Sequence, residues 1–183
     1  MLRKFFFWLE REYHGIGVIV FSLLVAFFAL SYSSVALNFL FSVGWVSISP
    51  DVPRHPGIEM LRLSFPFRLF TGALLEEILF RYLPFQMAVY RSEEFDIENY
   101  WKVKASVIIY ATCWSSVVFG LMHGNFFNIF IQGVVGIFFC LVFLKCGGMK
   151  RNFGKAVIAS AFCHFSYNGL IALIALSSGE TLF

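Results

Sequence analysis

The sequence predicts an all-α protein, a polytopic membrane bundle of about five transmembrane helices, from its composition and from long uncharged runs. Hydrophobic residues make up 59% of the 183 residues and charged residues 14%, against about 45–50% and about 25% in soluble domains. A chain of this length has too little interior to hide so much apolar surface from water. Uncharged runs in contact with lipid satisfy their backbone groups only as helices. A water-soluble globule is therefore excluded.

The N-terminal part of the chain predicts a cytoplasmic segment, residues 1–14, and one transmembrane helix, residues 15–45. The apolar run that starts at Phe5 stops at Glu10 after five residues, which is too short for the apolar region of a cleaved leader. Residues 15–45 contain no charged side chain. This run exceeds the roughly 20 residues that a helix needs to cross a bilayer, so we expect one long, tilted span.

The rest of the chain predicts a loop, residues 46–68, a membrane core of four helices, residues 69–176, and a short tail, residues 177–183. The loop contains four of the five prolines. Uncharged runs predict three spans of the core, at residues 105–122, 124–144 and 156–179. The remaining span, residues 69–90, has the right length but contains Glu76, Glu77 and Arg81. A charge at the centre of a membrane helix costs about 2.5–3.5 kcal/mol, so these three require an explanation.

The distribution of Lys and Arg predicts the orientation of the chain in the membrane. With five spans and a cytoplasmic N-terminus, ten basic residues fall in the inner segments and two, Arg54 and Arg62, in the outer segments. Basic residues accumulate on the cytoplasmic side of membrane proteins. We therefore expect a cytoplasmic N-terminus and an outer C-terminus. The net charge of +3 is too small to indicate a nucleic-acid partner.

The three charges of the second span differ in their expected partners. Glu77 and Arg81 are four residues apart, which places them on one helical face in the favourable order for an ion pair. Glu76 is turned by about 100° from Glu77 and needs a partner from another span. Candidates are His123, at the end of the third span, and His164, inside the fifth.

Asn168 completes a set of polar groups that is sufficient for amide hydrolysis. It follows His164 by four residues, so one helical face presents an imidazole and an amide together. The chain has no G-x-S-x-G nucleophile motif, which leaves water as the attacking group. A carboxylate assisted by one imidazole can take a proton from water. A second imidazole and an amide N–H can stabilise the oxyanion that forms when a carbonyl is attacked.

Two other functions would use the same polar residues. A non-enzymatic membrane partner, such as an immunity or assembly subunit, would use them as hydrogen-bonding contacts that lock the helices together. An ion or proton pathway would use the Glu and His side chains as a relay. An endopeptidase is distinguished from both because it loses turnover when Glu76 is replaced while the protein stays folded.

Three motifs resemble the signature of the CPBP family of intramembrane proteases, which includes the CAAX prenyl endopeptidases. The family pattern is Glu-Glu-x-x-x-Arg, Phe-x-x-x-His and His-x-x-x-Asn on successive membrane helices. Here the motifs occupy residues 76–81, 119–123 and 164–168, in the order of the family and on separate predicted spans. The similarity covers roughly residues 69–176 and leaves the first span outside it.

The resemblance implies a glutamate-type intramembrane protease, a peptide hydrolase without a cofactor. Its expected site residues are Glu76, His123, His164 and Asn168, supported by Glu77, Arg81 and Phe119. The first two would activate water, and the second two would stabilise the oxyanion. A zinc ion held by both histidines and Glu76 is the alternative, although no H-E-x-x-H motif places two ligands on one helical turn. The expected partners are the lipid bilayer and a membrane-delivered peptide substrate, such as a leader or a sorting tail.

Overall fold

The computed structural model describes residues 2–45, 64–92, 100–124 and 126–178, and these residues form helices without a β-strand. The result confirms the all-α membrane bundle that the sequence predicts. The elements in chain order are α1 (Leu2–Glu10), α2 (Ile16–Ser42), α4 (Ser64–Glu77), the π-helical η1 (Ile78–Tyr82), α5 (Leu83–Ser92), α6 (Tyr100–Met122), the π-helical η3 (Ile129–Gly133), α7 (Val134–Lys145), the short 3₁₀ helix η4 (Gly148–Lys150) and α8 (Phe153–Ser178).

Several helices have the length and composition of membrane spans. Three in the described residues are long and apolar enough to cross a bilayer, namely Ile16–Ser42, Ala105–Met122 and Phe153–Ile174, and the apolar helix Ile129–Lys145 is shorter. They coincide with four of the predicted spans. Large apolar side chains such as Phe27 and Phe28 of α2 are exposed on the surface of the bundle. Lipid is the solvent that tolerates such a surface, and the chain is an integral membrane protein.

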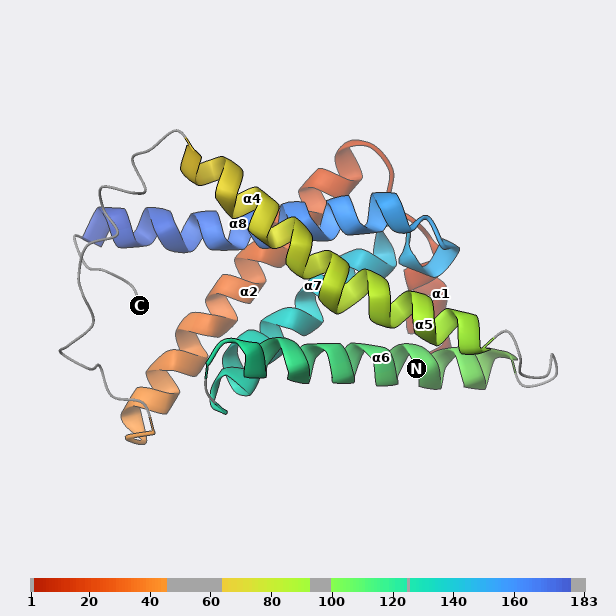
Figure 1. Ribbon diagram of the computed structural model, residues 1–183, viewed down its shortest axis with the longest axis horizontal. Helices are drawn as coiled ribbons and strands as arrows, with labels where there is room; N and C mark the ends of the chain where they lie inside the picture. Colours follow the sequence, from red (N-terminus) through yellow and green to blue (C-terminus); the bar gives the residue numbers. More distant parts are fainter. Residues whose placement is uncertain (1, 46–63, 93–99, 125, 179–183) are drawn as a thin grey trace.

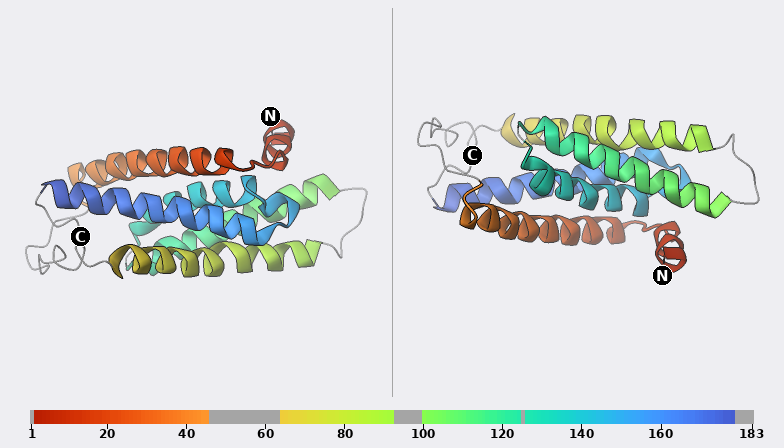
Figure 2. Two further views of the ribbon diagram at one scale, coloured as in Figure 1. Left: turned by 90° about the horizontal axis from the view of Figure 1, so that it is seen from above. Right: turned by 90° about the horizontal axis from the view of Figure 1, so that it is seen from below.

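The long helices form an elongated bundle in which α2, α7 and the α4–α5 helix cross α6 and α8 obliquely, and α1 lies at one end (Figures 1 and 2). Helix α8 packs against α4, α2 and α7, and α6 packs against η3, α5 and α7. Successive long helices run in alternating directions along the bundle (Figure 2). This alternation agrees with five crossings of a membrane. The orientation of the bundle, with the N-terminus in the cytoplasm, stays a prediction.

The helix that carries the membrane charges is longer than expected. Helix α4 begins at Ser64, so the predicted loop 46–68 is wrong for residues 64–68, while the remainder of that loop lies outside the described residues. Pro66 lies in the first turn of α4, where its missing N–H has no intrahelical partner to lose. The helix continues through η1 into α5. Short π-helical segments of this kind are rare and are frequent at functional sites.

Glycines allow close contacts where α6 and α7 meet their neighbours. A Cβ atom on Gly120 would lie 2.6 Å from the Cα atom of Ile129, so α6 and η3 touch through their backbones. A Cβ atom on Gly136 would lie 3.0 Å from Nη2 of Arg81. Lipid provides no hydrophobic force between helices, and close packing of small residues replaces it. These contacts hold α6 against η3 and α7 against the helix that carries Arg81.

Candidate active site

Glu77 and Arg81 form the ion pair that their spacing predicts. Both side chains are completely buried, and Arg81 Nη1 lies 3.3 Å from Glu77 Oε1, an ion pair without the alignment of a hydrogen bond. Arg81 Nη2 donates a hydrogen bond to the Gly136 carbonyl oxygen at 3.2 Å. The guanidinium carbon lies 4.4 Å from the centroid of the Phe119 ring, a cation–π contact that gains strength away from water. The pair therefore joins η1 to α6 and α7.

The second oxygen of Glu77 and a histidine extend this network into α8. Ser160 Oγ donates a hydrogen bond to Glu77 Oε2, and His164 Nδ1 lies 3.1 Å from Glu77 Oε1. Because a carboxylate only accepts hydrogen bonds, Nδ1 of His164 carries a proton. One buried carboxylate thus binds side chains from η1 and α8. The contact between Glu77 and His164 is an addition to the ion pair that the sequence predicts.

Stacking holds the His164 ring in a single orientation. The ring lies 4.4 Å from the Phe139 ring, with an interplanar angle of 25°, and 5.7 Å from the Phe119 ring in an edge-on arrangement. With Nδ1 bound to Glu77, the other ring nitrogen is directed toward Glu76, where Nε2 lies 3.7 Å from Oε2. His164 therefore stands between two carboxylates and presents Nε2 to Glu76.

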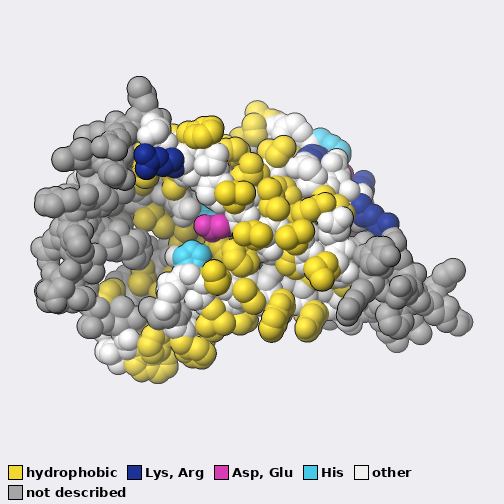
Figure 3. Space-filling model, viewed as in Figure 1, with side chains coloured by type: hydrophobic (Ala, Val, Ile, Leu, Met, Phe, Trp, Pro, Cys, Tyr) yellow, Lys and Arg dark blue, Asp and Glu magenta, His cyan; other side chains and the backbone are white. Residues whose placement is uncertain are grey.

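Glu76 occupies the boundary between the interior and the surface. Its side chain is 39% exposed, while its Oε2 atom is buried and has no hydrogen-bond partner among the described residues. Figure 3 shows an acidic side chain beside a histidine on a face that is otherwise largely hydrophobic. A carboxylate in such surroundings is expensive and marks a functional site more often than a structural one. Packing between the helices does not explain why a carboxylate lies at this position.

His123 directly follows the last residue of α6 and remains exposed. Its Nδ1 atom lies 2.7 Å from the Phe119 carbonyl oxygen, which assigns the proton to Nδ1 and the lone pair to Nε2. Its ring lies 4.6 Å from the Phe119 ring. Asn128 Nδ2 donates a hydrogen bond to the His123 carbonyl oxygen at 2.6 Å. Phe119 thus separates His123 from Arg81 and His164 and contacts all three.

The predicted site residues are brought together to different degrees. Glu76, Glu77, Arg81, His164 and Phe119 are linked by the contacts given above, and His123 joins them through Phe119. Asn168 lies on α8 one turn after His164 and is partly buried, so its place in the oxyanion site stays a prediction.

Two side chains that surround the Glu77–His164 pair, Ser160 and Phe139, were not predicted from the sequence. Ser160 precedes His164 by four residues, so the helical period that identified Asn168 also places Ser160 on the same face. A serine in an apolar helix is a weak signal by itself, because it often bonds to the backbone of its own helix. Phe139 comes from α7, and nothing in its local sequence indicates that it stacks on a histidine.

The arrangement of possible metal-binding side chains gives little support to a metal centre. In the parts of the chain that the structure describes, no three His, Cys, Asp or Glu side chains are grouped closely enough to hold a metal ion. Nδ1 of His164 is already used by Glu77. We therefore assign no step of the chemistry to a metal, and the zinc alternative becomes a matter for experiment.

Comparison with known proteins identifies the family. A family model described as type II CAAX prenyl endopeptidase Rce1-like matches residues 59–170. No curated protein and no solved structure matches the chain. The matched segment covers more than half of the 183 residues and contains all three motifs, which confirms the resemblance found in the sequence. The chain therefore belongs to the Rce1-like family of type II CAAX prenyl endopeptidases, a family of membrane-embedded peptide hydrolases.

Proposed function

We propose that the protein is a glutamate-dependent intramembrane endopeptidase that hydrolyses a peptide bond in a membrane-delivered substrate. The observation that supports this proposal most strongly is the relation of Glu76 to His164. The carboxylate oxygen and the ring nitrogen are 3.7 Å apart, too far for a direct hydrogen bond, and a polar gap of this size suits a bridging water. Glu76 is also the member of the acidic pair that reaches the surface.

In the proposed reaction, Glu76 acts as the general base. The carboxylate takes a proton from water while the water oxygen attacks the carbonyl carbon of the scissile bond. His123 orients the same water, because its Nδ1 proton is directed to the Phe119 carbonyl and its Nε2 lone pair can accept a hydrogen bond. The protonated Glu76 then donates its proton to the leaving amine as the C–N bond breaks. The products are a carboxylic acid and an amine, and the acid then loses its proton to give a carboxylate and an ammonium group.

His164 acts as the electrophilic partner in this reaction. Both of its ring nitrogens face carboxylates, Nδ1 toward Glu77 and Nε2 toward Glu76. A proton on Nε2 can be donated in a hydrogen bond to the developing oxyanion, and the Asn168 amide adds a second donor. Glu77 is enclosed by protein, so it serves to orient His164 and not to deprotonate water.

The surroundings of Glu76 favour a substrate that arrives through the lipid. Leu75 and Leu79 flank Glu76 along the helix and are exposed, so the carboxylate is approached across an apolar surface. A peptide that is itself embedded in the membrane can reach this surface by lateral diffusion. A leader or a sorting tail has these properties. With the N-terminus in the cytoplasm, the exposed end of α6 at His123 would lie nearer the outer face.

A peptide-cleavage assay tests the proposed function. The purified protein in a neutral detergent is incubated with a library of apolar peptides, and new termini are detected by mass spectrometry. We expect cleavage by the wild type, none by a folded Glu76→Gln variant, and unchanged cleavage by Glu10→Gln, which makes the same change on α1. Cleavage by folded Glu76→Gln would contradict the mechanism. If the protein instead conducts protons across liposomes in a way that depends on Glu76, and cleaves no peptide, the ion or proton pathway would be favoured over the protease.

A further inference from the structure

Helix α1 presents two kinds of surface. Phe6 and Leu9 are buried in the core of the bundle, whereas Phe5 is 47% and Phe7 56% exposed. The exposed side also carries Arg3. The helix lies crosswise to the long helices at the end of the bundle (Figures 1 and 2). A helix that combines basic and aromatic side chains and lies across the spans has the geometry of a membrane-surface helix.

Two lysines fix α1 and the segment that follows it to the rest of the protein. Lys145, buried at the end of α7, donates hydrogen bonds to the carbonyl oxygens of Trp8 and Arg11. It thus satisfies carbonyl groups at the C-terminal end of α1, the end at which a cation is favourable. Lys155 of α8 pairs with Glu12 at 2.6 Å. The surface of α1 is therefore held in a defined position and is not a loose tail.

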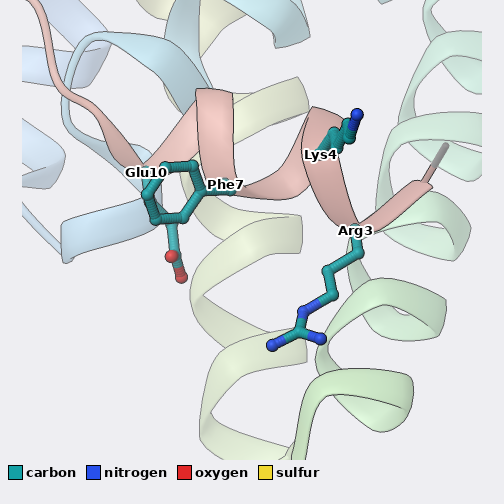
Figure 4. A pocket seen from close by; sticks show the side chains of 4 residues that line it. All are labelled: Arg3, Lys4, Phe7 and Glu10. Atoms are coloured by element: carbon teal, nitrogen blue, oxygen red, sulfur yellow. The ribbon is translucent and has the colours of Figure 1, made fainter.

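A groove of about 630 Å³ lies against α1, lined among the described residues by Arg3, Lys4, Phe7 and Glu10 (Figure 4). In this view the side chains of Arg3 and Glu10 extend to the same side of the helix. The Arg11 guanidinium lies 4.8 Å from the centroid of the Phe7 ring. The groove lining thus contains two basic groups and one acidic group beside an aromatic ring, and Arg11 adds a further positive charge next to that ring.

This combination of charges and rings matches the head of a phospholipid. Arginine presents a planar fork of donors that fits phosphate oxygens, and lysine adds a point charge. Aromatic side chains prefer the region between the headgroups and the acyl chains. The positive balance favours a lipid with a net negative charge over a zwitterionic one. Lys150 and Arg151 are also exposed, at the end of η4, which packs near α1, but they do not line the groove.

We propose that α1 is a binding site for an anionic glycerophospholipid. Arg3 binds the phosphodiester, Lys4 adds to the positive charge of the helix, and Phe5 and Phe7 enter the lipid below the headgroup. The bound lipid stabilises α1 against the end of the bundle from which α2 starts. This proposal does not depend on the protease chemistry, because the described residues that line the groove belong to α1 and Glu76 lies on a different helix.

Lipid binding to the delipidated full-length protein tests the proposal. Phosphatidylglycerol or phosphatidylcholine is added in a neutral detergent, and bound lipid is counted by native mass spectrometry, with the Tm as a second readout. We expect phosphatidylglycerol to bind and to raise the Tm. The double variant Arg3→Gln/Lys4→Gln should bind it about tenfold more weakly, because each basic residue adds to the attraction of an anionic lipid. Both side chains are exposed, so the variant should fold.

A charge-matched control separates the site from general attraction. The double variant Lys150→Gln/Arg151→Gln removes two positive charges at the same end of the bundle and should keep most of the phosphatidylglycerol binding. Equal losses in both double variants would overturn the proposed site, as would equal binding of phosphatidylcholine by the wild type. Soluble glycerol 3-phosphate should neither raise the Tm nor displace the lipid. If it does so as well as the lipid, the groove binds a free phosphate and the proposal is wrong.

Discussion

Glu76 and Glu77 are neighbours in the sequence and occupy opposite environments. Glu77 is completely buried and contacts Arg81, His164 and Ser160, whereas Glu76 is 39% exposed and turns a single oxygen toward His164. Consecutive residues on a helix differ in direction by about 100°. One position therefore points into the bundle and the other to its surface. In the proposed mechanism, Glu77 holds the helices together and orients His164, while Glu76 acts on the water.

Replacing Glu77 should destabilise the protein far more than replacing Glu76. Glu77→Ala leaves the Arg81 guanidinium buried without its counter-ion, which costs about 3–5 kcal/mol. We expect a large fall in the Tm in detergent, with activity lost together with the fold. Glu76→Ala makes the same change at the neighbouring carboxylate and should change the free energy of unfolding by less than about 1 kcal/mol. Equal Tm values for the two variants would show that Glu77 does not hold the helices together.

Ser160 should act as a positioning residue for His164 through Glu77. Ser160→Ala removes one hydrogen bond to the carboxylate that orients the ring, so we expect a several-fold fall in kcat with little change in KM. Ser160→Thr keeps the hydroxyl and should restore part of the rate. Ser166→Ala on the same helix is the control, because Ser166 donates only to the Phe162 carbonyl in the contacts described. A rate for Ser160→Ala equal to that of Ser166→Ala would exclude this role.

The contact between Gly120 and η3 should not tolerate a side chain. Gly120→Ala places a Cβ atom 2.6 Å from the backbone of Ile129, and such overpacking costs about 1–3 kcal/mol. Since His123 follows α6 directly, we expect a lower Tm and a slower reaction. Gly169→Ala has no atom within 4 Å of its new Cβ and should be neutral or stabilising, because alanine favours a helix by about 1 kcal/mol. A fully active, stable Gly120→Ala would contradict the packing.

The Glu12–Lys155 contact should make stability depend on acid pH. The hydrogen bond from Lys155 lowers the pKa of Glu12 below its usual 4.5, against an opposing effect of burial. The contact therefore stabilises the fold fully above about pH 4.5, and this stabilisation is lost as the pH falls through the lowered pKa. A plot of Tm against pH should have a weaker acid decline in Glu12→Gln than in the wild type. Identical acid declines would show that the contact adds no stability.

Removal of metal ions should leave the activity unchanged. The proposed chemistry uses Glu76 and two histidines, and the described residues provide no group of three metal ligands. Cleavage after dialysis against a strong chelator is compared with cleavage in untreated protein. A loss of activity that zinc restores would replace the water-activation mechanism with the zinc alternative.

The sequence predicts the membrane spans and which motif residues share a helical face, because uncharged runs and i,i+4 spacing are local properties of the chain. It does not predict that α4 starts at Ser64, since a proline early in a segment is compatible with both a loop and a first helical turn. The π-helical segments η1 and η3 are also absent from the prediction. The stacking of Phe139 on His164 depends on packing between helices and is likewise not predicted. Side-chain contacts between helices that are far apart in the chain leave no pattern in the sequence around either residue.

The most direct test of the central claim is the single-turnover cleavage rate of wild type and Glu76→Gln at equal folded fractions. If Glu76 is the general base, the amide cannot take a proton from water, and the rate should fall by about 10²–10⁴-fold while the Tm is preserved. A folded Glu76→Gln variant that cleaves at the wild-type rate would contradict the account.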